Sequence, residues 1–140
     1  MPLKGFGSLC SRNAAQIVSR DQGNPQYHRG INKNRCYVTH YKIDGVVIKG
    51  ESACDFLLIN EESRVAYLIE LKGSDLVKAV RQLEVTEDML RRELSLYTVQ
   101  YRIVANKCKT QEIRSSEYRK YQIRWKGRLL QKTGFIEENI

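Results

Sequence analysis

Two consecutive apolar runs, residues 54–60 and 65–72, constrain the fold of this chain more than any other feature of its sequence. Each run has the length of a β-strand, and the polar connection between them, Asn-Glu-Glu-Ser-Arg at 60–64, suits a hairpin. Apolar residues fill both alternating sets of positions, which is typical of a strand covered on both faces. The sequence therefore predicts a β-hairpin at the centre of a sheet, with other elements packed on each side.

The residues before this hairpin carry weaker signals. Residues 11–20 have a helical composition, and the Gly-Asn-Pro segment at 23–25 ends the predicted helix. Residues 26–35 are interpreted as a polar, basic loop. Residues 36–49 alternate and are rich in β-branched and aromatic side chains around an Asp-Gly turn signal at 44–45, so they predict a strand, a turn and a second short strand.

The residues after the hairpin predict two helices and two strands. Ser74 is a suitable N-cap for a helix that runs to about residue 95 with apolar residues on one side. The remaining elements are a strand at 97–105, a basic helix at 115–126 ended by Gly127, and a strand at 128–135. A hairpin turning at 126–127 is the alternative for the last two elements. This order predicts an α/β (α+β) fold, a single domain over residues 1–140 with a central mixed β-sheet flanked by helices.

An excess of basic residues limits the classes of partner. The chain has 24 Lys and Arg against 16 Asp and Glu, a formal net charge of +8, which attracts polyanions and makes nucleic acid the first partner to consider. The apolar stretches are far shorter than the ~20 residues of a membrane-spanning helix. Residues 1–10 lack the apolar core of a secretory signal. We therefore expect a cytoplasmic protein that does not enter a membrane.

Three charged residues interrupt the two apolar runs: Asp55 in the first, and Glu70 and Lys72 in the second. If the hairpin turns at 62–63, Asp55 and Glu70 are equidistant from the turn and lie opposite each other on one face, and Lys72 projects to the same face. Two carboxylates ~5 Å apart repel by roughly 3 kcal/mol at an effective dielectric near 20, and a divalent cation with hard oxygen ligands offsets this repulsion. The alternatives are a solvent-facing salt bridge on an edge strand and a core ion pair between Glu70 and Lys72.

This pattern of an acid on one strand and Glu-x-Lys on the next resembles the PD-(D/E)xK nuclease superfamily, and its size and order of elements are most similar to the small resolvase-like and phage or archaeal endonucleases. The resemblance covers about residues 36–105 and implies a restriction-endonuclease-like fold. It also implies that Asp55, Glu70 and the backbone carbonyl of Leu71 bind Mg²⁺ or Mn²⁺, and that Lys72 orients the attacking water.

Two features near this motif bear on the resemblance, one in its favour and one against it. Several branches of the superfamily place a Gln or a basic residue on the helix after the motif, facing the active site, so Gln82 and Lys78 are candidates for supporting side chains. Simple exposure on that helix is the alternative for both. Many members also supply a further acid from the first helix, whereas residues 11–20 contain none and Asp21 follows them. This departure puts a two-metal mechanism in doubt.

Two groups of basic residues are candidates for binding nucleic acid, because cations bind phosphates and release counterions. They are Arg29, Lys33 and Arg35 before the first predicted strand, and Arg119, Lys120, Arg124 and Lys126 near the C-terminus. Tyr121 and Trp125 are interleaved with the second group; we expect them to pack in the core rather than to stack on bases.

The sequence thus predicts a metal-dependent endonuclease that hydrolyses phosphodiester bonds, with DNA, including branched or junction DNA, as the leading substrate and RNA not excluded. Cleavage of both strands of a duplex would require two sites and hence a homodimer. The alternative is a non-catalytic nucleic-acid-binding protein with a nuclease-like fold that acts as a subunit or regulator. It would bind nucleic acid in a salt-dependent way without metal-dependent turnover.

Overall fold

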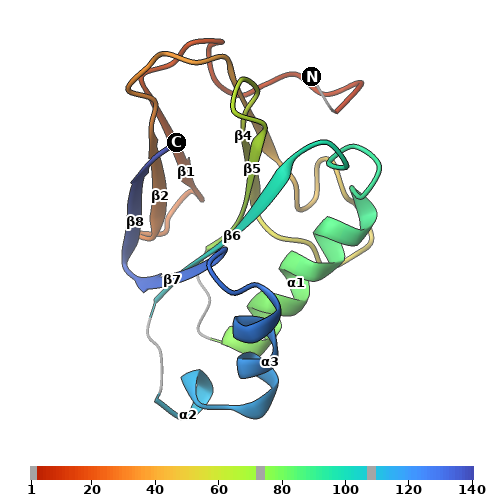
Figure 1. The fold of residues 1–140 in the computed structure, drawn as a ribbon, viewed down its shortest axis with the longest axis vertical. Coiled ribbons are helices and arrows are strands. Elements are labelled where there is room, and N and C mark those ends of the chain that lie inside the picture. Colours follow the sequence, from red (N-terminus) through yellow and green to blue (C-terminus); the bar gives the residue numbers. More distant parts are fainter. Residues whose placement is uncertain (1–2, 72–74, 107–109) are drawn as a thin grey trace.

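The computed structural model describes residues 3–71, 75–106 and 110–140 and has an α+β architecture of two mixed sheets and three helices (Figure 1). A five-stranded sheet forms the centre of the molecule. Its strands, in spatial order, are β3 (Val38–Lys42), β4 (Phe56–Asn60), β5 (Val65–Leu71), β6 (Thr98–Ala105) and β7 (Leu129–Thr133). The pairs β3–β4 and β4–β5 are antiparallel, whereas β5–β6 and β6–β7 are parallel.

The predicted central hairpin is confirmed as β4 and β5. Phe56 pairs with Ile69 and Asn60 with Val65, so the register is the one expected from a turn near 62–63. Every residue of β4 is buried, as is every residue of β5 after Val65. This burial agrees with the apolar character of both faces and places the hairpin between two covering layers.

A separate three-stranded sheet covers one face of the large sheet, and its presence corrects the N-terminal predictions. It consists of β1 (Gln16–Arg20), β2 (Tyr27–Ile31) and β8 (Phe135–Asn139), in the order β1-β2-β8. Residues 11–20 therefore do not form a helix, and 26–35 are not wholly a loop. In β1 the buried residues are Ile17 and Ser19 at a spacing of two, which is the period of a strand with one covered face.

Three helices complete the fold: α1 (Leu76–Met89), α2 (Thr110–Ile113) and α3 (Ser116–Arg124). The N-cap of α1 is Asp75, whose carboxylate accepts a hydrogen bond from the backbone N–H of Lys78, rather than Ser74, which lies outside the described residues. The helix also ends at Met89, earlier than predicted. The helix α3 and the strand β7 confirm the predicted helix and the strand that follows it, and they exclude the alternative hairpin at 126–127. Residues 135–139 form a further strand, β8, that was not predicted.

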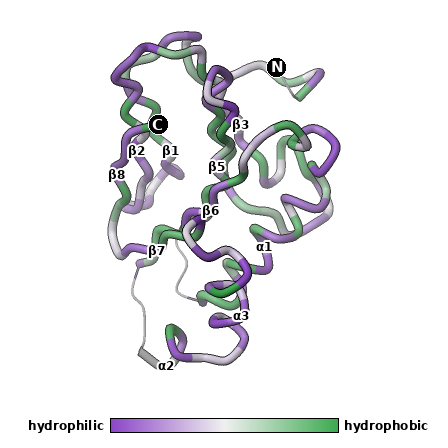
Figure 2. The backbone as a smooth tube through the Cα atoms, viewed as in Figure 1, coloured by the Kyte–Doolittle hydropathy of each residue, from purple (hydrophilic) through white to green (hydrophobic). Residues whose placement is uncertain are grey.

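The helices α1 and α3 cover the face of the large sheet opposite the small sheet, so helices flank the large sheet on one side only (Figure 1). Tyr118 and Tyr121 of α3 and its C-cap residue Trp125 are buried in the core, and the Trp125 ring stacks on Tyr101 with centroids 3.8 Å apart. The expectation that Tyr121 and Trp125 pack in the core is confirmed. In Figure 2 the colouring of β5 is largely hydrophobic, in agreement with its position between the small sheet and the helices. In the described ranges no helix is long and apolar enough to span a membrane.

Candidate active site

Asp55 and Glu70 lie opposite each other at the end of the β4–β5 hairpin that is farthest from its turn. The backbone N–H of Asp55 donates to the carbonyl oxygen of Ile69 (3.0 Å), the residue that pairs with Phe56, so Asp55 is hydrogen-bonded to β5 directly before β4 begins. Both acidic residues are 7% exposed, and the Glu70 side chain is close enough to affect the ionisation of Asp55. The register of β4 and β5, in which Phe56 pairs with Ile69, agrees with the predicted opposition of these two residues.

Two further charged residues lie close to Asp55 at this end of the central strands. The ammonium group of Lys42, at the end of β3, lies 3.5 Å from Oδ1 of Asp55 and 3.2 Å from Oδ1 of Asp21. Asp21 directly follows β1, so the small sheet contributes a carboxylate to the edge of the large one. The sequence prediction noted Asp21 only as the acid after residues 11–20, and it missed Lys42. Lys42 carried a usable signal, because it interrupts the apolar pair Tyr41 and Ile43 as Glu70 interrupts its strand.

The environment shifts the pKa of both Asp55 and Lys42, which form an ion pair. Burial raises the pKa of Asp55, and the nearby Asp21 carboxylate acts in the same direction; the Leu71 N–H, which donates to Oδ2 of Asp55 (2.8 Å), and the Lys42 ammonium oppose this shift. Burial alone would lower the pKa of Lys42, but Asp55 and Asp21 outweigh it and the pKa is raised. Lys42 is therefore charged at neutral pH.

Side chains of α1 hold the backbone that leads into Asp55. Gln82 donates from Nε2 to the carbonyl oxygen of Ala53 (3.3 Å), and the hydroxyl of Thr86 accepts a hydrogen bond from the Cys54 N–H (2.8 Å) while donating to the Gln82 carbonyl. The structure thus brings Gln82 to the site region, where it supports the backbone rather than contacting a carboxylate. Lys78 is exposed on α1, and its backbone N–H donates to the Asp75 cap.

The remaining predicted members of the site are Lys72 and Leu71. Lys72 lies outside the described residues. Leu71 is at the end of β5 with its side chain buried and its N–H on Asp55, so its carbonyl belongs to the same edge. Within residues 3–71, 75–106 and 110–140, no group of three or more His, Cys, Asp or Glu side chains is arranged to hold a metal ion. The oxygen donors at this end of the strands are the carboxyl groups of Asp55 and Glu70, the Asp21 carboxylate that contacts Lys42, and backbone oxygen.

The predicted basic residues fall on two different layers. Arg29 lies in β2, where it pairs with Glu137 (2.9 Å), and the exposed Lys33 and Arg35 follow that strand. The exposed Arg119, Lys120 and Arg124 lie on α3, and the exposed Lys126 follows it; Arg124 forms an ion pair with Glu84. Because the small sheet and α3 cover opposite faces of the large sheet, these seven residues do not form one continuous surface.

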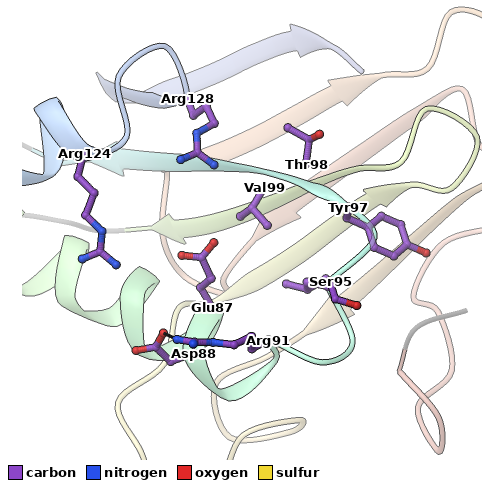
Figure 3. A pocket seen from close by; sticks show the side chains of 10 residues that line it. Glu87, Asp88, Arg91, Ser95, Tyr97, Thr98, Val99, Arg124 and Arg128 are labelled. Atoms are coloured by element: carbon purple, nitrogen blue, oxygen red, sulfur yellow. Dashed lines mark hydrogen bonds and ion pairs between the residues drawn. The ribbon is translucent and has the colours of Figure 1, made fainter.

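A pocket of about 520 Å³ lies at the other end of the parallel strands, between α1, the start of β6 and the end of α3. The side chains of Glu87, Arg124 and Arg128 point into it (Figure 3). Its acids already have partners, since Glu87 accepts a hydrogen bond from the Tyr101 hydroxyl (2.6 Å) and Asp88 pairs with Arg91 (2.6 Å). The opposed, buried carboxyl groups at the hairpin edge are therefore the stronger candidate for chemistry.

Comparison of the chain with protein families, with curated proteins and with solved structures finds no match.

Proposed function

We propose that this protein is a metal-dependent endonuclease that hydrolyses phosphodiester bonds in nucleic acid, with DNA as its substrate and Asp55, Glu70 and Lys72 as its catalytic residues. The observation that carries the proposal is the pair of opposed carboxyl groups, each 7% exposed, at the end of an otherwise apolar hairpin. Charged side chains are rarely buried unless they are paired or bind a metal. The excess of basic residues fits a polyanionic substrate.

The oxygen donors at this edge suit Mg²⁺ or Mn²⁺. Mg²⁺ usually keeps several waters and is bound through one or two carboxylates together with substrate phosphates, so two opposed carboxylates are sufficient without a third protein acid. Asp55 and Glu70 would hold the ion, with the carbonyl of Leu71 as an additional ligand. A bound metal ion supplies Lewis-acid polarisation of the phosphate and lowers the pKa of a water molecule to near neutrality.

The protein's own side chains orient these donors. The Leu71 N–H fixes Oδ2 of Asp55, and the Gln82 and Thr86 contacts fix the backbone before it. Lys42 neutralises part of the charge of Asp55. In the proposed mechanism Lys72 positions the attacking water and opposes the negative charge that builds on the phosphate.

The order of elements supports the same proposal. An acid on one strand, Glu-x-Lys on its antiparallel neighbour, and then a helix and a strand parallel to the second resemble the PD-(D/E)xK arrangement. In this chain Asp55 directly precedes β4 and Glu70 lies on β5, and the helix and the parallel strand are α1 and β6.

The test combines metal binding with cleavage. Mn²⁺ is titrated calorimetrically into the wild type, Asp55→Asn, Glu70→Gln and the control Glu51→Gln, which removes an exposed carboxylate from the loop before the site. We expect the first two substitutions to abolish Mn²⁺ binding and to reduce cleavage of labelled branched and duplex DNA by at least about a thousandfold. The control should retain both. Retained cleavage by Glu70→Gln would refute the assignment.

A non-catalytic nucleic-acid-binding protein is the second candidate. The ion pair of Lys42 with Asp55 favours it, because a built-in cation already neutralises part of the charge that a metal would offset. This candidate predicts tight, salt-dependent DNA binding by the wild type with neither Mn²⁺ binding nor cleavage.

A further inference from the structure

The outer face of the small sheet carries an aromatic stack. In β2 and β8, alternate side chains point away from the large sheet, among them Tyr27 and Phe135. Their rings are stacked with centroids 5.4 Å apart and planes inclined by 14°. Phe135 is 51% exposed, an unusual exposure for a side chain of this size. A large ring surface on this face is therefore open to a ligand.

An arginine extends this stack on the other side. Arg20 in β1 pairs with Tyr27, and Tyr27 pairs with Phe135, so the three residues form one row across the sheet. The Arg20 guanidinium carbon lies 4.6 Å from the Tyr27 ring centroid. Because β1 and β8 flank β2 on opposite sides, Arg20 and Phe135 approach Tyr27 from opposite sides. Arg29 adds a second guanidinium carbon 5.1 Å from the same ring centroid.

This row lies at the same end of the molecule as the candidate active site. Arg20 is followed directly by Asp21, which joins Lys42 and through it Asp55. Next to Tyr27, the Gln26 side chain donates to Asn106, the residue after β6 (3.1 Å).

Phe135, at the other end of the row, also lies near the end of the large sheet that carries the candidate active site. Before Phe135, the N–H of Gly134 donates to the carbonyl of Ala105, the last residue of β6 (2.8 Å). Leu71 pairs with Val104, so the ends of β5 and β6 lie side by side.

We propose that Arg20, Tyr27 and Phe135 bind an unpaired base of the nucleic-acid substrate, so that the protein acts on nucleic acid with a single-stranded segment next to the cleavage site. This inference deepens the proposed function: binding of an unpaired base does not depend on nuclease activity, whereas cleavage next to that base rests on the proposed function. A base stacks on the open Phe135 ring, Tyr27 supports that ring from behind, and Arg20 attracts the phosphates, whereas Arg29 is paired with Glu137.

The chemistry of this surface selects an unpaired strand. Bases stack on aromatic side chains with ~1–3 kcal/mol each, and every base offers a π-face whatever its identity. In a continuous duplex those faces are already covered by neighbouring base pairs. No described carboxylate lies within ion-pair distance of Arg20, so it is available to a phosphate. Stacking residues beside a cationic side chain are therefore better suited to a flap, a gap or a single strand than to an intact duplex.

A substituted reporter tests this directly. The chain has one tryptophan, Trp125, which is 1% exposed, so Phe135→Trp places a second, exposed indole at the proposed stacking position. We expect a labelled 12-nucleotide oligothymidylate, in EDTA, to quench the fluorescence of this variant and to bind it at least as tightly as it binds the wild type. Phe135→Ala should bind the same oligonucleotide about tenfold more weakly, while its affinity for blunt duplex changes less than twofold.

Leu96→Ala is the matched control, because it removes a side chain that is 74% exposed but lies after α1, away from the small sheet. Unchanged oligonucleotide affinity in Phe135→Ala, or equal losses for oligonucleotide and duplex, would overturn the inference. So would an absence of oligonucleotide binding combined with association of the protein through this face.

The binding assay contains no divalent metal, so it separates the two proposals. Oligonucleotide binding that depends on Phe135, without cleavage of any substrate, would support the stacking site and refute the nuclease. Metal-dependent cleavage of blunt duplex, unaffected by Phe135→Ala, would support the nuclease and refute the stacking site.

Discussion

Removing the charge of Glu138 should destabilise the protein in a pH-dependent way. Glu138 in β8 accepts two hydrogen bonds from the Arg102 guanidinium in β6 (2.7 and 2.9 Å), and its Oε2 also lies 2.7 Å from Nε2 of His28 in β2. Arg102 is 8% exposed and His28 is fully buried. This network fastens the small sheet, which carries Asp21 and the proposed stacking row, to the large sheet.

The size of the effect follows from the ionisation of Glu138. Burial alone would raise its pKa, but hydrogen bonds from His28 and Arg102 outweigh burial and lower the pKa from 4.5 to about 2. A difference of this size corresponds to about 3 kcal/mol of preferential stabilisation of the carboxylate. Solvent reaches 18% of the side chain and screens the charges, so we expect ~2 kcal/mol.

The sign follows from proton binding. Since the pKa is lower in the folded protein, the unfolded chain binds the proton more readily, and the stabilisation is complete above pH 4.5 and lost as the pH falls toward 2. In urea unfolding at pH 7, Glu138→Gln should lower the free energy of unfolding by ~2–4 kcal/mol, because it also leaves a buried guanidinium without its anion. Near pH 3 the difference from wild type should shrink by about half or more.

The control is Glu137→Gln, the preceding residue of β8, whose side chain is 45% exposed and pairs with Arg29 on the surface. It should cost less than about 0.5 kcal/mol at either pH. A Glu138→Gln difference that is below 1 kcal/mol at pH 7, or that stays constant down to pH 3, would show that the network does not stabilise the fold as reasoned.

Three further outcomes can be measured on the same protein. Lys42→Met should strengthen Mn²⁺ binding to Asp55 roughly tenfold in calorimetry, because it removes a cation that competes for the carboxylate; weaker binding would contradict this reasoning. Burial lowers the pKa of His40 to about 4, so the unfolded chain takes up a proton first as the pH falls below 6.5, and wild-type stability should drop between pH 6.5 and 4 while that of His40→Gln stays flatter. Thr86→Val leaves the buried Cys54 N–H without its acceptor and should cost ~1–3 kcal/mol in thermal or urea unfolding, whereas no loss would mean that another acceptor replaces the hydroxyl.

The main errors of the sequence prediction fall on the three strands of the small sheet. In β1, β2 and β8 the more buried positions alternate with less buried ones, so these strands lack the continuous apolar run that marks β4 as a buried strand. Gly30 is an example: in β2 an added Cβ would lie 2.8 Å from a methyl group of Leu58, so the glycine reflects close packing of the two sheets rather than a loop. Nothing adjacent to Gly30 in the sequence reveals this contact.

By itself the sequence determined the β4–β5 hairpin and its register, because a short polar loop between two apolar runs fixes antiparallel register locally. The expected opposition of Asp55 to Glu70 follows from that register. Only the tertiary structure decided that Asp21 and Lys42 meet this pair and that Phe135 stacks on Tyr27. These contacts depend on parallel and inter-sheet packing between segments as many as 108 residues apart, as in the pairing of Tyr27 with Phe135. Such packing is set by the burial of whole layers rather than by any local pattern of residues.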